Sequence, residues 1–229
     1  KSLNYFISEI KINPPILSKI TLIDIKDKEL INYKDFFIKE SNSDLKATTY
    51  ISPDYSLCSE CKREIFDKNN RRYRYPLTNC TNCGPRFSII KNLPYDRDFT
   101  TMNDFEMCDS CKAEYNNPEN RRFHAQPNAC PICGPRAYIV DKNNNEIITD
   151  DPLDTAIALL KQGKIFAIKG IGGFNLVCDS SNEDAIKLLR EKKYRPTKPF
   201  AVMIKNIESV RKYCNIKKEE EELLKSNKR

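Results

Sequence analysis

The apolar positions near the N-terminus predict one helix and two strands. The spacing from Leu3 to Ile10 is helical and predicts an amphipathic helix over 1–12, which the Pro-Pro pair that follows would end. Lys19–Ile25 and Asp35–Ile38 are predicted as strands joined by a charged turn. Because a helix and two strands bury too little surface to be stable alone, we expect this segment to be part of a small α+β unit.

The C-terminal third has the alternating pattern of an α/β unit. From residue 151 onward, apolar runs and helical periods follow each other, which is typical of β-α-β connections. Asp151 before Pro152 marks a helix start, and Ser180 with Glu183 has the spacing of a capping box. The predicted helices are 153–162, 182–192, 206–213 and 217–228, and the predicted strands are Lys164–Lys169, which we expect to be buried, Phe174–Cys178 and Phe200–Ile204.

The middle of the chain has little apolar periodicity. Residues 42–57 are polar and predict a linker, and residues 58–137 offer few positions for an apolar core. Within 138–150, the polar run from Asp141 to Glu146 predicts a turn between two short strands. A segment of this kind needs some other source of stability, and a bound metal is one such source.

The cysteines indicate such a metal site, because eight of the ten form four C-x2-C pairs. Every cysteine of the first half recurs 50 residues later, together with Glu64, Arg71, Arg72 and the Gly84-Pro85-Arg86 run. The block is therefore an internal duplication. The repeated spacing C-x2-C-x18-C-x2-C is typical of a zinc site. The eight candidate ligands are Cys58, Cys61, Cys80, Cys83, Cys108, Cys111, Cys130 and Cys133.

Two structural zinc ions are the interpretation that we favour. Two thiolates three residues apart occupy two corners of a tetrahedron, and the second pair supplies the other two corners, which leaves no open position for a catalytic water. Disulfides would require an oxidising compartment, for which the sequence has no signal. We assume sequential pairing of the C-x2-C motifs, although spacing alone leaves a crossed pairing open. His124 is expected at the surface, and Cys178 is expected to be a buried free thiol.

Charge changes the picture only modestly. The formal net charge of the 229 residues is +7, but each four-thiolate zinc centre carries about −2, which lowers the expected value to about +3. Mean hydropathy is −0.63. No run approaches the roughly 20 apolar residues of a membrane span, and the opening residues lack the apolar region of a secretory signal, so we expect a soluble, cytoplasmic protein.

Two C-terminal motifs have the composition of an anion-binding site. The turn Gly170–Gly173 is able to bring backbone N–H groups close to a phosphate. The run from Lys192 to Phe200 concentrates cations at a helix C-terminus and in a Pro-fixed segment. Helix dipole complementarity explains these cations as well as phosphate binding does, and the residues alone leave the two explanations even.

These motifs together resemble the HypF family of carbamoyltransferases in [NiFe]-hydrogenase maturation. The resemblance rests on the Cys80-Thr81-Asn82-Cys83-Gly84-Pro85-Arg86 knuckle and its second copy, on the run Ala167–Phe174, and on the run Lys193–Met203. It implies an α+β multidomain protein. The implied divisions are the end of an acylphosphatase-like domain at 1–41, a linker at 42–57, two zinc fingers within 58–137 (58–87 and 108–137), and the start of a YrdC-like nucleotide-binding domain at 151–229.

The resemblance also implies a chemistry. Carbamoyl phosphate is hydrolysed, the carbamate is coupled to ATP with Mg as carbamoyl-adenylate, and the carbamoyl group passes to the C-terminal cysteine of HypE, which turns it into a cyanide ligand for iron. The acylphosphatase catalytic residues and the transfer domain lie outside this chain. The implied nucleotide or carbamoyl contacts are Lys169, Gly170, Gly172, Gly173, Asn175, Lys193, Arg195 and Lys198. Asn175 stands where the family usually has His.

The alternative function is a zinc-dependent nucleic-acid-binding module. Paired fingers with repeated arginines motivate this alternative. The fingers have no obvious base-reading helix, however, so we regard nucleic acid as the less favoured partner. In the preferred interpretation the fingers are a rigid spacer, and their Arg and Tyr side chains are solvated surface unless they line a channel for carbamate.

Overall fold

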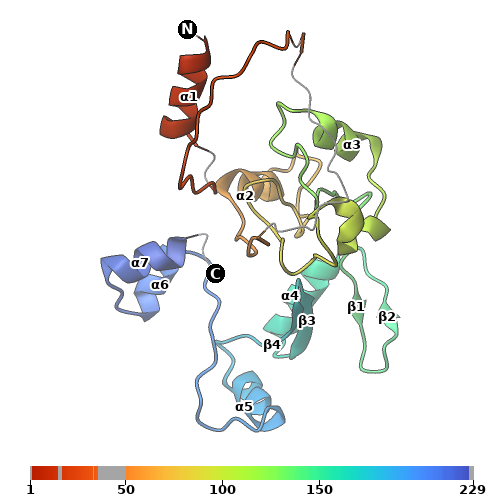
Figure 1. The fold of residues 1–229 in the computed structure, drawn as a ribbon. Coiled ribbons are helices and arrows are strands. Elements are labelled where there is room, and N and C mark those ends of the chain that lie inside the picture. Colours follow the sequence, from red (N-terminus) through yellow and green to blue (C-terminus); the bar gives the residue numbers. More distant parts are fainter. Residues whose placement is uncertain (1, 15–16, 33, 36–49, 227–229) are drawn as a thin grey trace. The chain divides into compact units, whose positions relative to one another are not determined.

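The chain divides into two compact units, Lys1–Tyr50 and Ile51–Arg229. A computed structural model describes the chain apart from residues 1, 15–16, 33, 36–49 and 227–229 (Figure 1). The architecture is mixed α+β, as predicted, with two four-cysteine clusters followed by helices and a two-stranded hairpin.

The first unit contains helix α1, Ser2–Ile12, which confirms the predicted helix. The predicted strand Lys19–Ile25 is wrong, because described residues 18–32 form no strand. A strand requires a partner for its backbone hydrogen bonds, and Leu22 in this segment is 83% exposed. Most of the second predicted strand, Asp35–Ile38, lies outside the described residues.

The duplicated block consists of short helices and turns. Helix α2, Ser59–Phe66, and helix α3, Asp109–Asn116, are the same segment of the two copies, and each follows the first cysteine of its copy. Two short 3-10 helices, η1 (Arg97–Phe99) and η2 (Thr101–Asp104), lie between the copies. A small apolar cluster of Tyr75, Ile89, Met102 and Ala129 supplements the buried cysteines as the core of this region.

The predicted turn at 138–150 is confirmed. Strands β1, Ile139–Val140, and β2, Glu146–Ile147, pair antiparallel. The carboxylate of Asp141 accepts hydrogen bonds from the backbone N–H groups of Asn143 and Asn145, which fixes the turn between the strands.

The glycine motif lies in a β-hairpin. Helix α4, Pro152–Lys161, begins at its predicted cap Asp151, and strands β3, Phe166–Gly170, and β4, Gly173–Val177, then pair antiparallel. The two consecutive strands predicted here are therefore confirmed, with bounds shifted by one or two residues. The expected β-α-β order is wrong only because no further strand follows α5 in the described part of the chain. The expectation that Lys164–Lys169 is buried is also wrong, because four of the five residues of β3 are exposed.

Three helices follow the hairpin. Helix α5, Glu183–Lys192, is capped by the side chain of Asn182 and not by the predicted Ser180. An amide oxygen one residue before the helix reaches the third N–H of the first turn, which Ser180 is too far away to do. Helices α6, Ile207–Tyr213, and α7, Lys218–Lys225, confirm the prediction, and no helix among the described residues is long and apolar enough to cross a bilayer.

The predicted strand Phe200–Ile204 is wrong, since the segment is irregular. It has no strand partner among the described residues, and Met203 is 99% exposed. The ring of Phe200 instead lies under two guanidinium groups, with Arg190 at 4.9 Å and Arg195 at 5.3 Å from the ring centroid. These cation–π contacts hold the segment against the C-terminal end of α5.

Candidate metal centres

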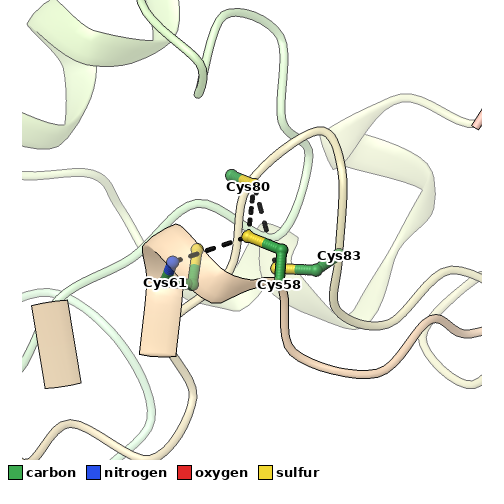
Figure 2. A group of neighbouring side chains, drawn as sticks. All are labelled: Cys58, Cys61, Cys80 and Cys83. Carbon is green, nitrogen blue, oxygen red and sulfur yellow. Dashed lines mark hydrogen bonds between the residues drawn. The ribbon is translucent and has the colours of Figure 1, made fainter. Parts of the chain in front are cut away.

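The eight cysteines of the C-x2-C pairs form two clusters. Within each cluster the sulfur atoms all lie within 4.8 Å of one another, and all of these cysteines are free thiols. The structure groups the motifs in sequential order, one cluster for each copy. In the first cluster, Cys58 and Cys61 lie at the start of α2 and face Cys80 and Cys83 on a loop (Figure 2). The members are Cys58, Cys61, Cys80 and Cys83 in the first cluster, and Cys108, Cys111, Cys130 and Cys133 in the second.

The sulfur separations fit a tetrahedral zinc ion. With Zn–S bonds of about 2.3 Å, the edges of the sulfur tetrahedron are about 3.8 Å. The separations are 3.7 Å for Cys58–Cys80, 3.8 Å for Cys80–Cys83 and 3.8 Å for Cys108–Cys130. A disulfide would bring two sulfurs to about 2 Å. Four soft thiolate ligands at these separations are consistent with structural zinc.

Backbone N–H groups point at the sulfur atoms in the first cluster. The N–H of Asn82 donates to Cys80 Sγ at 3.3 Å, and that of Cys61 donates to Cys58 Sγ at 3.5 Å. The chain then turns at Gly84, whose φ of +91° is unfavourable for residues with a Cβ. A Cβ at this position would lie 2.6 Å from the Cβ of Asn79. Glycine after the knuckle is therefore required by both conformation and space.

Arginines of each copy contact the cysteine cluster of the other copy. We define the first finger as 58–87 and the second as 108–137. Arg71 of the first finger donates to Cys111 Sγ of the second at 3.4 Å, and Arg121 of the second donates to Cys61 Sγ of the first at 2.9 Å. The two arginines occupy equivalent positions in the duplication, so the exchange is reciprocal.

The neighbouring arginines repeat the exchange in a more buried setting. The Nε of Arg72 donates to the carbonyl oxygen of Ala129 at 2.9 Å, and the Nε of Arg122 donates to the equivalent carbonyl of Asn79 at 3.0 Å. Both side chains are at most 3% exposed. The expectation of solvated finger arginines is therefore wrong for this pair, because their donors are used inside the finger pair.

Two glutamates balance these arginines. Glu114 pairs with Arg71 and Arg72, both at 2.6 Å, and Glu64 pairs with Arg121 and Arg122. Burial opposes ionisation of Glu114, but hydrogen bonds from Arg72 and Arg71 outweigh it and lower the pKa of the carboxyl to about 2. The sequence marked these glutamates as repeated but gave no reason to place them across the finger boundary.

Asn128 is a buried linking residue that the sequence did not indicate. Its side chain is fully buried, accepts a hydrogen bond from Arg72 and donates to the carbonyl oxygen of Cys111. It links the buried arginine of one finger to a cysteine of the other. No repeat marks it, because the equivalent residue of the first copy is Thr78.

The other predicted histidine and cysteine positions lie outside both clusters. His124 is exposed, as predicted, and its ring stacks on Tyr115 with centroids 5.0 Å apart. Cys178 is only half-buried, so the expectation of a buried thiol is wrong, and Cys214 is exposed.

The first group of predicted nucleotide contacts lies in the hairpin. Lys169 and Asn175 are exposed on β3 and β4, and the Nζ of Lys169 lies 4.9 Å from the ring centroid of Phe174. Gly170 and Gly173 pair at the end of the hairpin, and Gly172 has a φ of +88°. The turn therefore requires glycine for its conformation.

The second group follows helix α5. Lys193 caps the helix and Lys198 is exposed. Arg195 donates to the carbonyl oxygen of Pro199 at 2.9 Å and so stabilises its own loop. Among the described residues, no hydrogen bond, ion pair or ring contact joins this group to the hairpin, so the structure does not bring the two predicted groups into one site.

Comparison with known families identifies the duplicated block. The HypF finger model matches residues 57–90 and 107–140, each span containing one four-cysteine cluster. A second model, Sua5/YciO/YrdC, described as "Telomere recombination", matches residues 158–229. The chain belongs to the HypF family.

Relatives in this family match most of the chain. The probable carbamoyltransferase HypF of Methanocaldococcus jannaschii is 51% identical over 204 residues, which is 87% of this chain and 26% of the relative. The carbamoyltransferase HypF of Synechocystis is 49% identical over 214 residues, which is 93% of this chain and 28% of the relative. The chain thus spans about a quarter of the length of these HypF relatives.

Solved HypF structures share the fold. The crystal structure of full-length HypF in the phosphate- and nucleotide-bound form matches with a TM-score of 0.89 and 48% identity, over 98% of this chain and 29% of that one. The crystal structure of T. kodakarensis HypF gives a TM-score of 0.86 and 46% identity, over 99% of this chain and 28% of that one.

Proposed function

We propose that this chain is the middle segment of a carbamoyltransferase that acts in the cytoplasm during [NiFe]-hydrogenase maturation. The observation that carries the proposal is the duplicated four-cysteine finger pair, which matches the HypF finger in both copies. The eight cysteines bind two structural zinc ions. The domain divisions are those stated from the sequence, with 1–41 acylphosphatase-like, 42–57 a linker, 58–137 the fingers and 151–229 YrdC-like.

The reaction of the whole protein uses carbamoyl phosphate and ATP with Mg. Hydrolysis of carbamoyl phosphate gives carbamate and phosphate. The carbamate then attacks the α-phosphate of ATP and pyrophosphate leaves. The sulfur of the C-terminal cysteine of HypE attacks the carbamoyl carbon of the resulting carbamoyl-adenylate, and AMP leaves as the cysteine proton is lost. Lys169, Lys193 and Lys198 supply cations for the phosphates or the carbamoyl group. Their exposure in the described structure leaves their ammonium groups accessible to a ligand.

The contacts of the finger arginines count against nucleic-acid binding. Arg71, Arg72, Arg121 and Arg122 are all paired with Glu64 or Glu114. Phosphate binding would require these guanidinium groups to exchange a partly buried carboxylate for an exposed phosphate. Retention of duplex at physiological salt would nevertheless favour the nucleic-acid alternative.

The test uses the whole protein that contains this chain. With carbamoyl phosphate and ATP we expect pyrophosphate release, and a carbamoylated HypE cysteine detectable by peptide mass spectrometry. Lys193→Ala should lower pyrophosphate release, whereas Lys187→Ala, an exposed change on α5, should not. Unchanged release in Lys193→Ala would contradict the assignment of this lysine, and absence of HypE modification by the unaltered protein would contradict the function.

A further inference from the structure

Each finger supplies guanidinium donors to the cysteine sulfurs of the other finger. Arg71 lies in the first finger and contacts Cys111 Sγ and Glu114 of the second. Arg121 lies in the second finger and contacts Cys61 Sγ and Glu64 of the first. We propose that Arg71 and Arg121 are positioning residues that retain the zinc ion of the opposite finger, so that each metal centre depends on the other copy.

Charge explains why each arginine contacts the cysteine cluster of the opposite finger. A zinc ion with four thiolates carries an excess charge of about −2, and donors to the sulfurs stabilise it. The guanidinium of Arg71 reaches Cys111 Sγ through both terminal nitrogens, at 3.4 and 3.5 Å. Glu114 holds this guanidinium in place from the helix that carries Cys111. The guanidinium of Arg71 is therefore held in place by the finger whose cysteine it contacts.

The equivalent contact in the first finger is shorter. Arg121 Nη1 lies 2.9 Å from Cys61 Sγ, and Glu64 on the same helix as Cys61 pairs with Arg121 at 2.5 Å. The carbonyl oxygen of Arg121 also accepts hydrogen bonds from the N–H and the hydroxyl of Thr81 in the first finger. The equivalent of Thr81 in the second copy is Pro131, which has neither donor. The attachment of Arg121 therefore includes backbone hydrogen bonds that the second copy cannot make in the same way.

The buried arginines make the exchange part of the core. Arg72 and Arg122 also reach across the boundary between the fingers. The Nε of each donates a hydrogen bond to a backbone carbonyl oxygen of the opposite finger. Their removal would test packing more than metal retention, because both are almost fully buried. Arg71 and Arg121 are 34% and 22% exposed, so substitution at these positions disturbs the core less.

The test measures metal retention separately in each finger. The zinc-loaded 229-residue chain is challenged with a chelator and a thiol-alkylating reagent, and the modified cysteines are identified by peptide mass spectrometry. Zinc content is measured first, and a value below two in the unaltered chain would overturn the metal assignment itself. The variants are Arg71→Gln and Arg121→Gln, with Arg136→Gln as a matched control. Arg136 is 69% exposed and pairs with Glu146.

We expect each substitution to affect the cysteines of the opposite finger. Arg121→Gln should accelerate alkylation of the first-finger cysteines on the order of 10-fold. Arg71→Gln should do the same for the second-finger cysteines. The reason is that loss of a hydrogen-bond partner of a metal ligand costs about 10–100-fold in metal affinity. Arg121→Lys, which keeps a charge and one donor, should recover part of the protection. A variant that loses one zinc during purification gives the same answer, because the unprotected cysteines identify the empty finger.

Three results would overturn the proposal. One is acceleration in the finger that carries the substitution. Another is equal acceleration in both fingers, which indicates general loosening. The third is a rate no different from that of Arg136→Gln.

Discussion

Arg72 and Glu114 form a two-point ion pair across the boundary between the fingers. The Nη2 and Nη1 atoms of Arg72 lie 2.6 and 3.0 Å from the two carboxylate oxygens of Glu114, and the arginine side chain is only 2% exposed. The residues are 42 positions apart in the sequence and belong to different copies of the duplication. This pair is one of several contacts that join the two fingers into one structural unit.

Neutralising Glu114 should destabilise that unit. Glu114→Gln leaves the buried guanidinium of Arg72 without its counter-charge, and breaking a buried pair from one side costs about 3 kcal/mol or more. Urea unfolding at constant excess zinc would measure the loss. Glu119→Gln, an exposed change just after the same helix, should be nearly neutral. Equal midpoints for the two variants would show that the pair contributes nothing.

Gly84→Ala should destabilise the first finger through its backbone. The φ of +91° and the 2.6 Å approach of a new Cβ to Asn79 both oppose the substitution, and we expect a loss of about 1–3 kcal/mol. Gly173→Ala is the matched control, because a Cβ there meets no heavy atom within 4 Å. Thermal unfolding followed by circular dichroism would compare the two. A larger loss for Gly173→Ala would contradict this account of the knuckle.

Removal of zinc should unfold the fingers before the C-terminal helices. In the described part of the chain, five of the 13 buried apolar residues are zinc-site cysteines, so metal replaces much of the core. With a chelator present, limited proteolysis should cut between residues 57 and 140 while α5 stays protected. Added zinc in excess over the chelator should restore protection. Simultaneous cleavage of both regions would mean that the metal stabilises the whole second unit.

Alkaline pH should remove the folding stability that the neutral hydroxyl of Tyr95 contributes. Burial raises the pKa of its hydroxyl from about 10 to about 12, and the hydroxyl donates to the carbonyl oxygen of Pro85. Because the folded-state pKa is raised, the stabilisation is complete below pH 10 and is lost as the pH rises from about 10 to about 12.

Urea unfolding at pH 9 and pH 11 would test this. The stability of the unaltered chain should fall by up to about 1 kcal/mol more than that of Tyr95→Phe, in which this phenol is absent and other titrations are unchanged. Parallel losses in the two proteins would contradict the buried position of this hydroxyl.

Local patterns in the sequence were sufficient for several elements. The cap at Asp151, the turn after Val140 and helices α1, α4, α6 and α7 were predicted because caps, turns and helical periods depend on residues close together in the chain. The predictions at Lys19–Ile25 and Phe200–Ile204 failed because a strand exists only where a partner accepts its hydrogen bonds.

The sequence by itself determined the duplication, the identity of the eight cysteines and the family to which the chain belongs. Spacing is enough for these, since two thiolates three residues apart form half of a tetrahedron whatever surrounds them. Only the tertiary structure decided that the arginines of one finger contact the cysteine cluster of the other. Arg121 and Cys61 are 60 positions apart, and a repeated motif is the same whether its copies stand separately or exchange side chains. Arg71 and Arg121 cross the boundary because each guanidinium finds there both a carboxylate of opposite charge and a cysteine sulfur that accepts its hydrogen bond.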